Sequence, residues 1–173
     1  MRRLLLLRHA KSDWPADVAD LERPLAARGR AEAPAIGAFM AREELRPDLA
    51  LVSPAKRTRQ TWTLIASALG DPPHEVEPRL YMATADTLLG LVRKTRGNVR
   101  TLLLLGHNPG LEELARGLSN RGDKSALKQL AAAYPTSGLA VIDFAVADWG
   151  KIKELTGTLR HFVTPRSLGA RHK

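Results

Sequence analysis

Short aliphatic runs alternate along this chain with longer stretches whose apolar residues recur at helical spacing. Two runs of four leucines, at 4–7 and 102–105, are bounded by charged or polar residues, which is typical of short buried strands. The strands that this pattern predicts are residues 3–7, 49–52, 75–77, 99–105, 138–146 and 151–162. The predicted helices are residues 29–44, 54–69, 86–96 and 125–133, together with one that begins at Pro109. Residues 10–28 and 120–124 are polar and are expected to be loops.

This alternation of strands and helices predicts an α/β fold in which parallel strands are joined by helical crossovers. Open sheets of this kind place their ligands outside the carboxyl ends of the strands. Functional residues are therefore expected just after Leu7, Val52 and Leu105.

The length of 173 residues is enough for one domain with its own hydrophobic core. We expect this domain to span residues 1–164, followed by a basic C-terminal tail at 165–173. The absence of cysteine excludes a disulfide scaffold, a thiol nucleophile and a cysteine-based zinc site. The leucine runs are too short for a membrane span or a secretory signal, so a soluble cytoplasmic protein is expected.

The formal net charge of +9 comes from the two ends of the chain. Residues 1–60 carry 12 basic and 8 acidic side chains, and residues 150–173 carry 6 and 1. This excess attracts anions of any kind, including phosphates and acidic partner proteins. Aromatic residues make up only 5% of the chain, and no basic cluster is interleaved with them, which argues against nucleic acid as the partner.

Two histidines occupy equivalent positions relative to the two leucine runs. His9 lies two residues past the first run, and His107 lies two residues past the second. If both runs are neighbouring parallel strands, about 4.8 Å apart, both imidazoles emerge at one edge of the sheet and flank one small ligand. A single histidine at a strand end is more often an ordinary loop residue, but the matched pair favours the functional interpretation.

Two arginines accompany these histidines. Arg57 lies one turn into the helix that follows Val52, where free backbone N–H groups favour an anion, and Arg8 directly precedes His9. The planar guanidinium group makes paired hydrogen bonds to phosphate oxygens, so both side chains suit a phosphate site. Lys56 and Arg59 are more typical of a solvated helix surface.

Several common routes to phosphate chemistry are missing from the sequence. There is no P-loop motif, no dinucleotide-binding glycine motif and no cluster of carboxylates that would hold magnesium. Without cysteine, a histidine nucleophile remains, and neither a metal nor an organic cofactor is expected.

Four blocks of the sequence together resemble a known family. They are Arg8-His9-Ala10-Lys11-Ser12, Arg23-Pro24-Leu25 with Gly29, Ser53-Pro54 with Arg57, and Gly106-His107-Asn108-Pro109. In this order they are similar to the blocks of the histidine phosphatase superfamily, in particular its SixA-type phosphohistidine phosphatases. The resemblance covers most of the chain, from about residue 2 to residue 145. It implies the phosphoglycerate-mutase-like fold, a three-layer α/β/α sandwich with a mostly parallel central sheet.

The resemblance also implies roles for the residues of these blocks. His9 would be the nucleophile that becomes transiently phosphorylated. Arg8, Arg57 and a protonated His107 would bind the phosphoryl oxygens, which requires the two histidines to differ in pKa. The residues expected to bind substrate are Arg8, Arg57, His107, Ser12 and Asn108.

The sequence departs from the family pattern in ways that bear on the substrate. Ala10 replaces a usual glycine, and Pro15 stands where asparagine is frequent. Larger family members carry a carboxylic general acid, but this chain has Asn108 after the second histidine and no acid at residues 78–82. Glu77 or Asp13 could take this role, although each is more typical of a solvated carboxylate.

The missing acid favours a substrate whose leaving group needs little protonation. An alkoxide requires a proton as it leaves, whereas an imidazole nitrogen protonates near neutral pH. The first hypothesis is therefore a metal-independent phosphatase that removes phosphate from phosphohistidine in proteins. The alternatives are a phosphatase of small esters, such as sugar phosphates or nucleotides, and a non-catalytic phosphate- or nucleic-acid-binding module.

Overall fold

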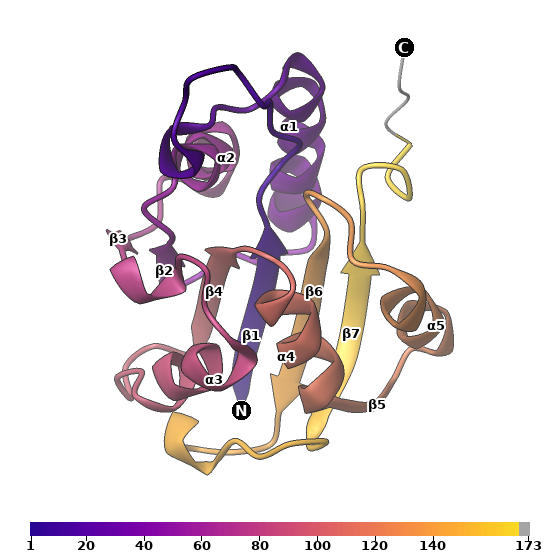
Figure 1. Ribbon diagram of the computed structural model, residues 1–173. Helices are drawn as coiled ribbons and strands as arrows, with labels where there is room; N and C mark the ends of the chain where they lie inside the picture. Colours follow the sequence, from indigo (N-terminus) through magenta and orange to yellow (C-terminus); the bar gives the residue numbers. More distant parts are fainter. Residues whose placement is uncertain (170–173) are drawn as a thin grey trace.

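A computed structural model describes residues 1–169 and shows one seven-stranded sheet with helices on both faces (Figure 1). The strands are β1 (Arg2–Arg8), β2 (Leu49–Val52), β3 (His74–Val76), β4 (Thr101–Gly106), β5 (Ser119–Gly122), β6 (Leu139–Phe144) and β7 (Gly157–Val163). The α-helices are α1 (Ala27–Arg42), α2 (Lys56–Ala66), α3 (Ala85–Arg93), α4 (Gly110–Leu118) and α5 (Lys124–Ala132). Short 3₁₀ helices are η1 (Asp20–Glu22), η2 (Ser67–Leu69), η3 (Pro78–Leu80) and η4 (Trp149–Lys151).

The sheet is mostly parallel, as the sequence predicts. Its strand order is β3-β2-β4-β1-β6-β7-β5. Strands β3, β2, β4 and β1 pair in parallel, and β7 pairs in parallel with β5. Within residues 1–169, β6 alone runs against its neighbours, because it pairs antiparallel with both β1 and β7.

The two leucine runs lie side by side in the centre of the sheet. Leu7 pairs with Leu105, and Arg8 pairs with Gly106. Val52 at the end of β2 also pairs with Leu105. The chain therefore leaves β1, β2 and β4 at one edge, which is where the sequence places the functional residues.

Helices cover both faces of the sheet and complete a three-layer sandwich (Figure 1). Leu4 and Leu6 point into the core beneath α3, α4 and α5, whereas Leu5 and Leu7 point into the core beneath α1 and α2. This division follows from the strand period of two residues. Each of these leucines is fully buried, and burial of one such side chain contributes about 1.5–3 kcal/mol.

Three segments differ from the sequence-based expectation. Residues 119–122 form an edge strand, β5, although their polar composition predicts a loop. Strand β7 begins only at Gly157, since the chain before it first forms η4 and buries the indole of Trp149. Residues 165–169 of the expected tail form turns, and Leu168 packs against the core beneath α1 and α2, while residues 170–173 lie outside the described residues. No helix in the described part of the chain is long and apolar enough to cross a bilayer.

Candidate active site

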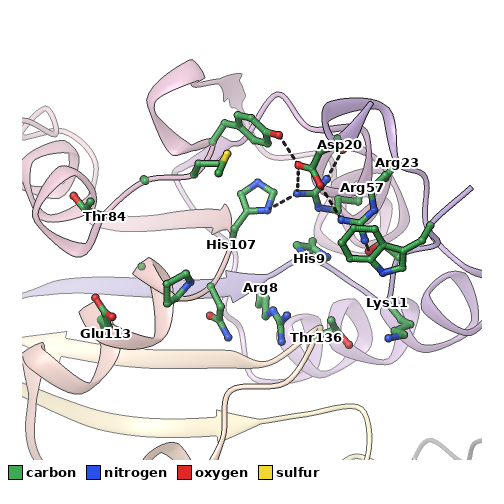
Figure 2. Close-up of a pocket in the computed structure, with 18 residues that line it drawn as sticks. Arg8, His9, Lys11, Asp20, Arg23, Arg57, Thr84, His107, Glu113 and Thr136 are labelled. Atoms are coloured by element: carbon green, nitrogen blue, oxygen red, sulfur yellow. Dashed lines mark hydrogen bonds and ion pairs between the residues drawn. The ribbon is translucent and has the colours of Figure 1, made fainter. Parts of the chain in front are cut away.

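A cavity of about 600 Å³ opens at the carboxyl edge of β1, β2 and β4 (Figure 2). Segments far apart in the sequence meet around it: the loop after β1, the first turn of α2, the segment between η3 and α3, and the start of α4. Its charged and titratable lining residues are Arg8, His9, Lys11, Asp20, Arg23, Arg57, Tyr81, His107 and Glu113.

His9 follows β1 and is held in one orientation by a backbone carbonyl. Its Nδ1 lies 2.7 Å from the carbonyl oxygen of Ala10. Because a carbonyl only accepts, Nδ1 carries the proton and Nε2 keeps its lone pair. Burial lowers the pKa of His9 to about 3, and the positive charges of Arg57 and Arg8 add to this effect. At neutral pH the imidazole is therefore uncharged and has the form that a nucleophile requires.

His107 lies on the facing side of the cavity, with its ring centroid 5.3 Å from that of His9. Its Nε2 is 2.8 Å from the hydroxyl oxygen of Ser53, and Nδ1 is 3.4 Å from Nη2 of Arg57. Since a guanidinium only donates, these partners assign the proton of the neutral ring to Nε2. Ser53 does not cap the helix after β2, because α2 begins at Lys56 without a side-chain cap.

Burial and a neighbouring charge favour the neutral form of His107. Burial lowers the pKa of His107 to about 4, and the charge of Arg57 adds to the effect. The protonated His107 that the resemblance implies would bind phosphoryl oxygens, so it concerns the site with phosphate present and stays a prediction. Both histidine pKa values lie well below the ordinary value of 6.5, and that of His9 is the lower.

Arg8 and Asn108 share one anchoring atom. Arg8 donates from Nη1 to the carbonyl oxygen of Tyr134 at 3.0 Å, and Asn108 donates from Nδ2 to the same oxygen at 2.9 Å. The hydroxyl of Tyr134 in turn donates to the carbonyl oxygen of Leu6. This tyrosine, which the sequence did not single out, therefore fixes two of the predicted site residues against strand β1.

Arg57 is buried in the first turn of α2 and points to the same cavity. Its Nη1 donates to the backbone carbonyl of Asp20 at 2.7 Å, and its Nη2 donates to the carboxylate of Asp20 at 3.1 Å. Within residues 1–169, the Nε atoms of Arg57 and Arg8 are buried and have no hydrogen-bond partner. Such unsatisfied buried donors are costly, and both guanidinium groups line a cavity that an anion can enter.

Asp20 in η1 is a site residue that the sequence analysis missed. Its carboxylate accepts hydrogen bonds from the hydroxyl of Tyr81, from Nη1 of Arg23 and from Arg57. These bonds hold the pKa of Asp20 well below its usual range, with the bond from Tyr81 as the largest cause. The group therefore stays ionised and orients Arg57. Asp20 lies in a polar stretch without periodicity. The only sequence signal for it is its position three residues before the Arg23-Pro24 block.

Ser12 lines the cavity as predicted, but its hydroxyl is already engaged. It accepts a hydrogen bond of 2.6 Å from Nη2 of Arg23. Arg23 is buried and also donates to the backbone of Asp13, and the ring of Trp14 covers its guanidinium at 3.2 Å. These contacts fold the loop after β1 over the edge of the site.

The two carboxylates named as substitutes for a general acid lie elsewhere. Glu77 is paired with Arg79 at 2.9 Å and does not line the cavity, and neither does the exposed Asp13. Glu113 on α4 does line the cavity, although its side chain is exposed. Among the described residues, no three His, Cys, Asp or Glu side chains are grouped as a metal site.

Comparison with known proteins agrees with this geometry. The model of the histidine phosphatase superfamily (branch 1) matches residues 4–98. An uncharacterized protein of Mycobacterium tuberculosis, Rv1276c, is 35% identical over 162 residues, which cover 92% of this chain and 100% of that protein.

Solved structures extend the similarity to the whole fold. The crystal structure of a candidate phosphohistidine phosphatase SixA from Agrobacterium tumefaciens has 33% sequence identity and a TM-score of 0.80, over 95% of this chain and 98% of that one. The protein histidine phosphatase SixA complexed with tungstate has 22% identity and a TM-score of 0.77, over 96% of this chain and 99% of that one, and shares the fold. The chain therefore belongs to the histidine phosphatase superfamily, is of the SixA type, and is a histidine-type phosphatase.

Proposed function

We propose that this phosphatase removes the phosphoryl group from phosphohistidine in proteins, through a phosphorylated intermediate on His9. The observation that carries the proposal is the convergence of four groups on one cavity. His9 and His107 face each other at 5.3 Å between ring centroids, and Arg8 and Arg57 line the same space (Figure 2).

In the first step, the lone pair on Nε2 of His9 attacks phosphorus. The new P–N bond forms while the bond from phosphorus to the substrate imidazole breaks, and that imidazole leaves with its electron pair and takes up a proton. Arg8 and Arg57 neutralise the charge on the three equatorial oxygens, which is the largest expected contribution to catalysis. The phosphoryl charge also raises the pKa of His107, so that this ring can carry a proton once substrate is bound.

In the second step, water attacks the phosphorus of phospho-His9. The P–Nε2 bond breaks, phosphate is released, and His9 regains its lone pair. The hydrogen bond from Nδ1 to Ala10 keeps the ring in one orientation through both steps. The same cationic groups act on both transition states.

The engaged state of Asp20 favours phosphohistidine over an ester. Asp20 is ionised and engaged by three donors, so it is a poor general acid. An imidazole leaving group does not require a strong acid, because its nitrogen protonates near neutral pH. The name of the Agrobacterium tumefaciens relative, at 33% identity, is consistent with the same substrate class.

A second candidate function is the hydrolysis of small phosphate esters. It is favoured by Glu113, which lines the cavity from α4 and could protonate an alkoxide there. Membership of a phosphatase family argues against the third alternative, a non-catalytic binding module.

Substrate comparison tests the proposal directly. We expect a higher kcat/KM for a histidine-phosphorylated protein than for sugar phosphates, nucleotides or p-nitrophenyl phosphate. A preference for the esters would refute the proposed substrate class. Glu113→Gln serves as the matched variant, since a general acid role would reduce ester hydrolysis and leave phosphohistidine hydrolysis nearly unaffected.

A further inference from the structure

Two of the large hydrophobic side chains that remain exposed lie at the cavity. Within residues 1–169 there are seven such exposed side chains: Met1, Trp14, Val18, Leu21, Val76, Met82 and Leu155. Two of them, Trp14 and Met82, line the cavity, and Val18, Leu21 and Val76 lie within seven residues of one of these two in the sequence. Large exposed apolar side chains at the mouth of a cavity are candidate contacts for a partner molecule.

Trp14 is fixed in place and yet open to solvent. Its ring stacks on the guanidinium of Arg23 at 3.2 Å, and Arg23 is itself held by Ser12 and Asp20. The tryptophan side chain nevertheless remains 76% exposed. A rigid aromatic ring with one free face loses little conformational entropy on binding, as in the dominant residues of protein interfaces.

Met82 borders the cavity from another segment, between η3 and α3. It is 77% exposed, and its backbone has a φ of 53°. The left-handed region is uncommon for a residue with a long side chain, and this conformation sets the direction of the Met82 side chain. The preceding residue, Tyr81, bonds to Asp20 and ties this segment to the site. In Figure 2, Thr84 of this segment and Arg23, on which Trp14 stacks, lie on opposite sides of His107.

The charge around these two residues restricts the partner. Residues 12–22 contain four acidic side chains and no basic one. Asp20 is paired with Arg23 and Arg57, which leaves the exposed Asp13, Asp17 and Glu22 beside a cavity that is itself lined by arginines. A molecule with several phosphates would be repelled by this acidic loop. A partner with a single phosphoryl group fits better: the phosphoryl group matches the arginine-lined cavity, and an apolar or basic surface around it matches the acidic loop.

We propose that Trp14 and Met82 are contact points for a folded protein that presents one phosphohistidine on an apolar and basic surface. The inference rests on the proposed function, because it assumes that the phosphoryl group enters the cavity between His9 and His107. It adds that protein substrates are recognised by the rim of the cavity, formed by Trp14 and Met82, and not by the phosphoryl group alone.

The test compares two substrates that differ only in what surrounds the phosphohistidine. One is free phosphohistidine, and the other is a small helical protein phosphorylated on one surface histidine with basic neighbours. The measured quantity is the ratio of kcat/KM for the protein to kcat/KM for the free amino acid. We expect Trp14→Ala and Met82→Ala each to lower this ratio about tenfold, as the loss of an interface anchor does. Leu155→Ala is the control, because this residue is also exposed but does not line the cavity, and it should leave the ratio unchanged.

The outcomes separate this inference from the proposed function. If the wild type hydrolyses neither substrate, the proposed function fails. If it hydrolyses both and the two variants leave the ratio unchanged, the rim does not recognise protein and the inference is overturned. Sedimentation velocity provides the second readout: a wild-type dimer that Trp14→Ala or Met82→Ala converts to a monomer would assign this surface to self-association and also overturn it.

Discussion

Asp20 and Arg57 are joined by two hydrogen bonds, one from each terminal nitrogen of the guanidinium. Nη1 donates to the backbone carbonyl of Asp20 at 2.7 Å, and Nη2 donates to its carboxylate at 3.1 Å. The same Nη2 lies 3.4 Å from Nδ1 of His107. The orientation of this cavity-lining arginine therefore depends on a carboxylate 37 residues away in the sequence.

Asp20→Asn removes this charge while keeping the shape of the side chain. The bond from Arg57 to the carboxylate weakens, and we expect kcat/KM for phosphohistidine to fall about tenfold. The effect is no larger because the carboxylate is partly exposed and solvent screens its charge. Inhibition by inorganic phosphate should weaken in parallel, because the same guanidinium binds it, and Asp20→Glu should recover part of both. Asp17→Asn in the same loop is the control, and equal effects of the two asparagine variants would contradict a positioning role for Asp20.

His9→Ala removes the proposed nucleophile. We expect turnover of phosphohistidine to fall by at least about 10³-fold, as for other covalent catalysts that lose their nucleophile. Wild-type protein quenched during turnover should carry an acid-labile, base-stable phosphoryl label that the variant lacks. His74→Ala, at an exposed histidine in β3, should keep both activity and label. Turnover that survives in His9→Ala would exclude the phosphohistidine intermediate.

Stability should depend on pH because two histidines are buried in neutral form. The pKa values of about 3 for His9 and about 4 for His107 lie below the ordinary value of 6.5, which an unfolded chain regains. The unfolded state therefore binds more protons below about pH 6.5, and the free energy of unfolding falls as the pH is lowered from there towards about 4. Above pH 6.5 this penalty is absent.

Urea unfolding at pH 7.5 and pH 5.0 measures this effect. We expect a smaller difference between the two pH values in His107→Gln than in the wild type, because the variant has one buried imidazole fewer to protonate. The carboxylate of Asp20 does not interfere, since its pKa lies below this window. An identical pH dependence in both proteins would show that His107 is not held neutral by the fold.

Gly29 at the start of α1 allows the loop after β1 to approach closely. A Cβ atom built there would lie 2.1 Å from the backbone carbonyl oxygen of Lys11. Gly29→Ala must therefore displace this loop, and we expect a loss of about 1–3 kcal/mol in the free energy of unfolding together with reduced kcat/KM. The control is Gly90→Ala inside α3, where nothing lies within 4 Å. That variant should gain about 0.5–1 kcal/mol, and a similar loss in both would refute the steric explanation.

The sequence alone determined the framework of the fold and brought the candidate site residues to one cavity. The leucine runs specify buried strands because their pattern is local, and the rule for parallel sheets then brings His9 and His107 to one edge. Arg8 and Arg57 follow from the same reasoning, since each lies directly at a strand end or a helix start. The edge strand β5 escaped prediction because its pairing with β7 leaves its polar side chains exposed, so no alternating pattern is required.

Only the tertiary structure decided how these groups are tuned. The bonds of Asp20 to Arg57 and Tyr81, and that of Ser53 to His107, join loops 37 to 61 residues apart, and no local pattern encodes such distances. The neutral state of His107 likewise arises because several elements bury its ring at once, and burial disfavours the charged form of an imidazole. Local periodicity thus selects strands, helices and their ends, whereas protonation and orientation depend on solvent exclusion and on long-range contacts that exist only in the folded chain.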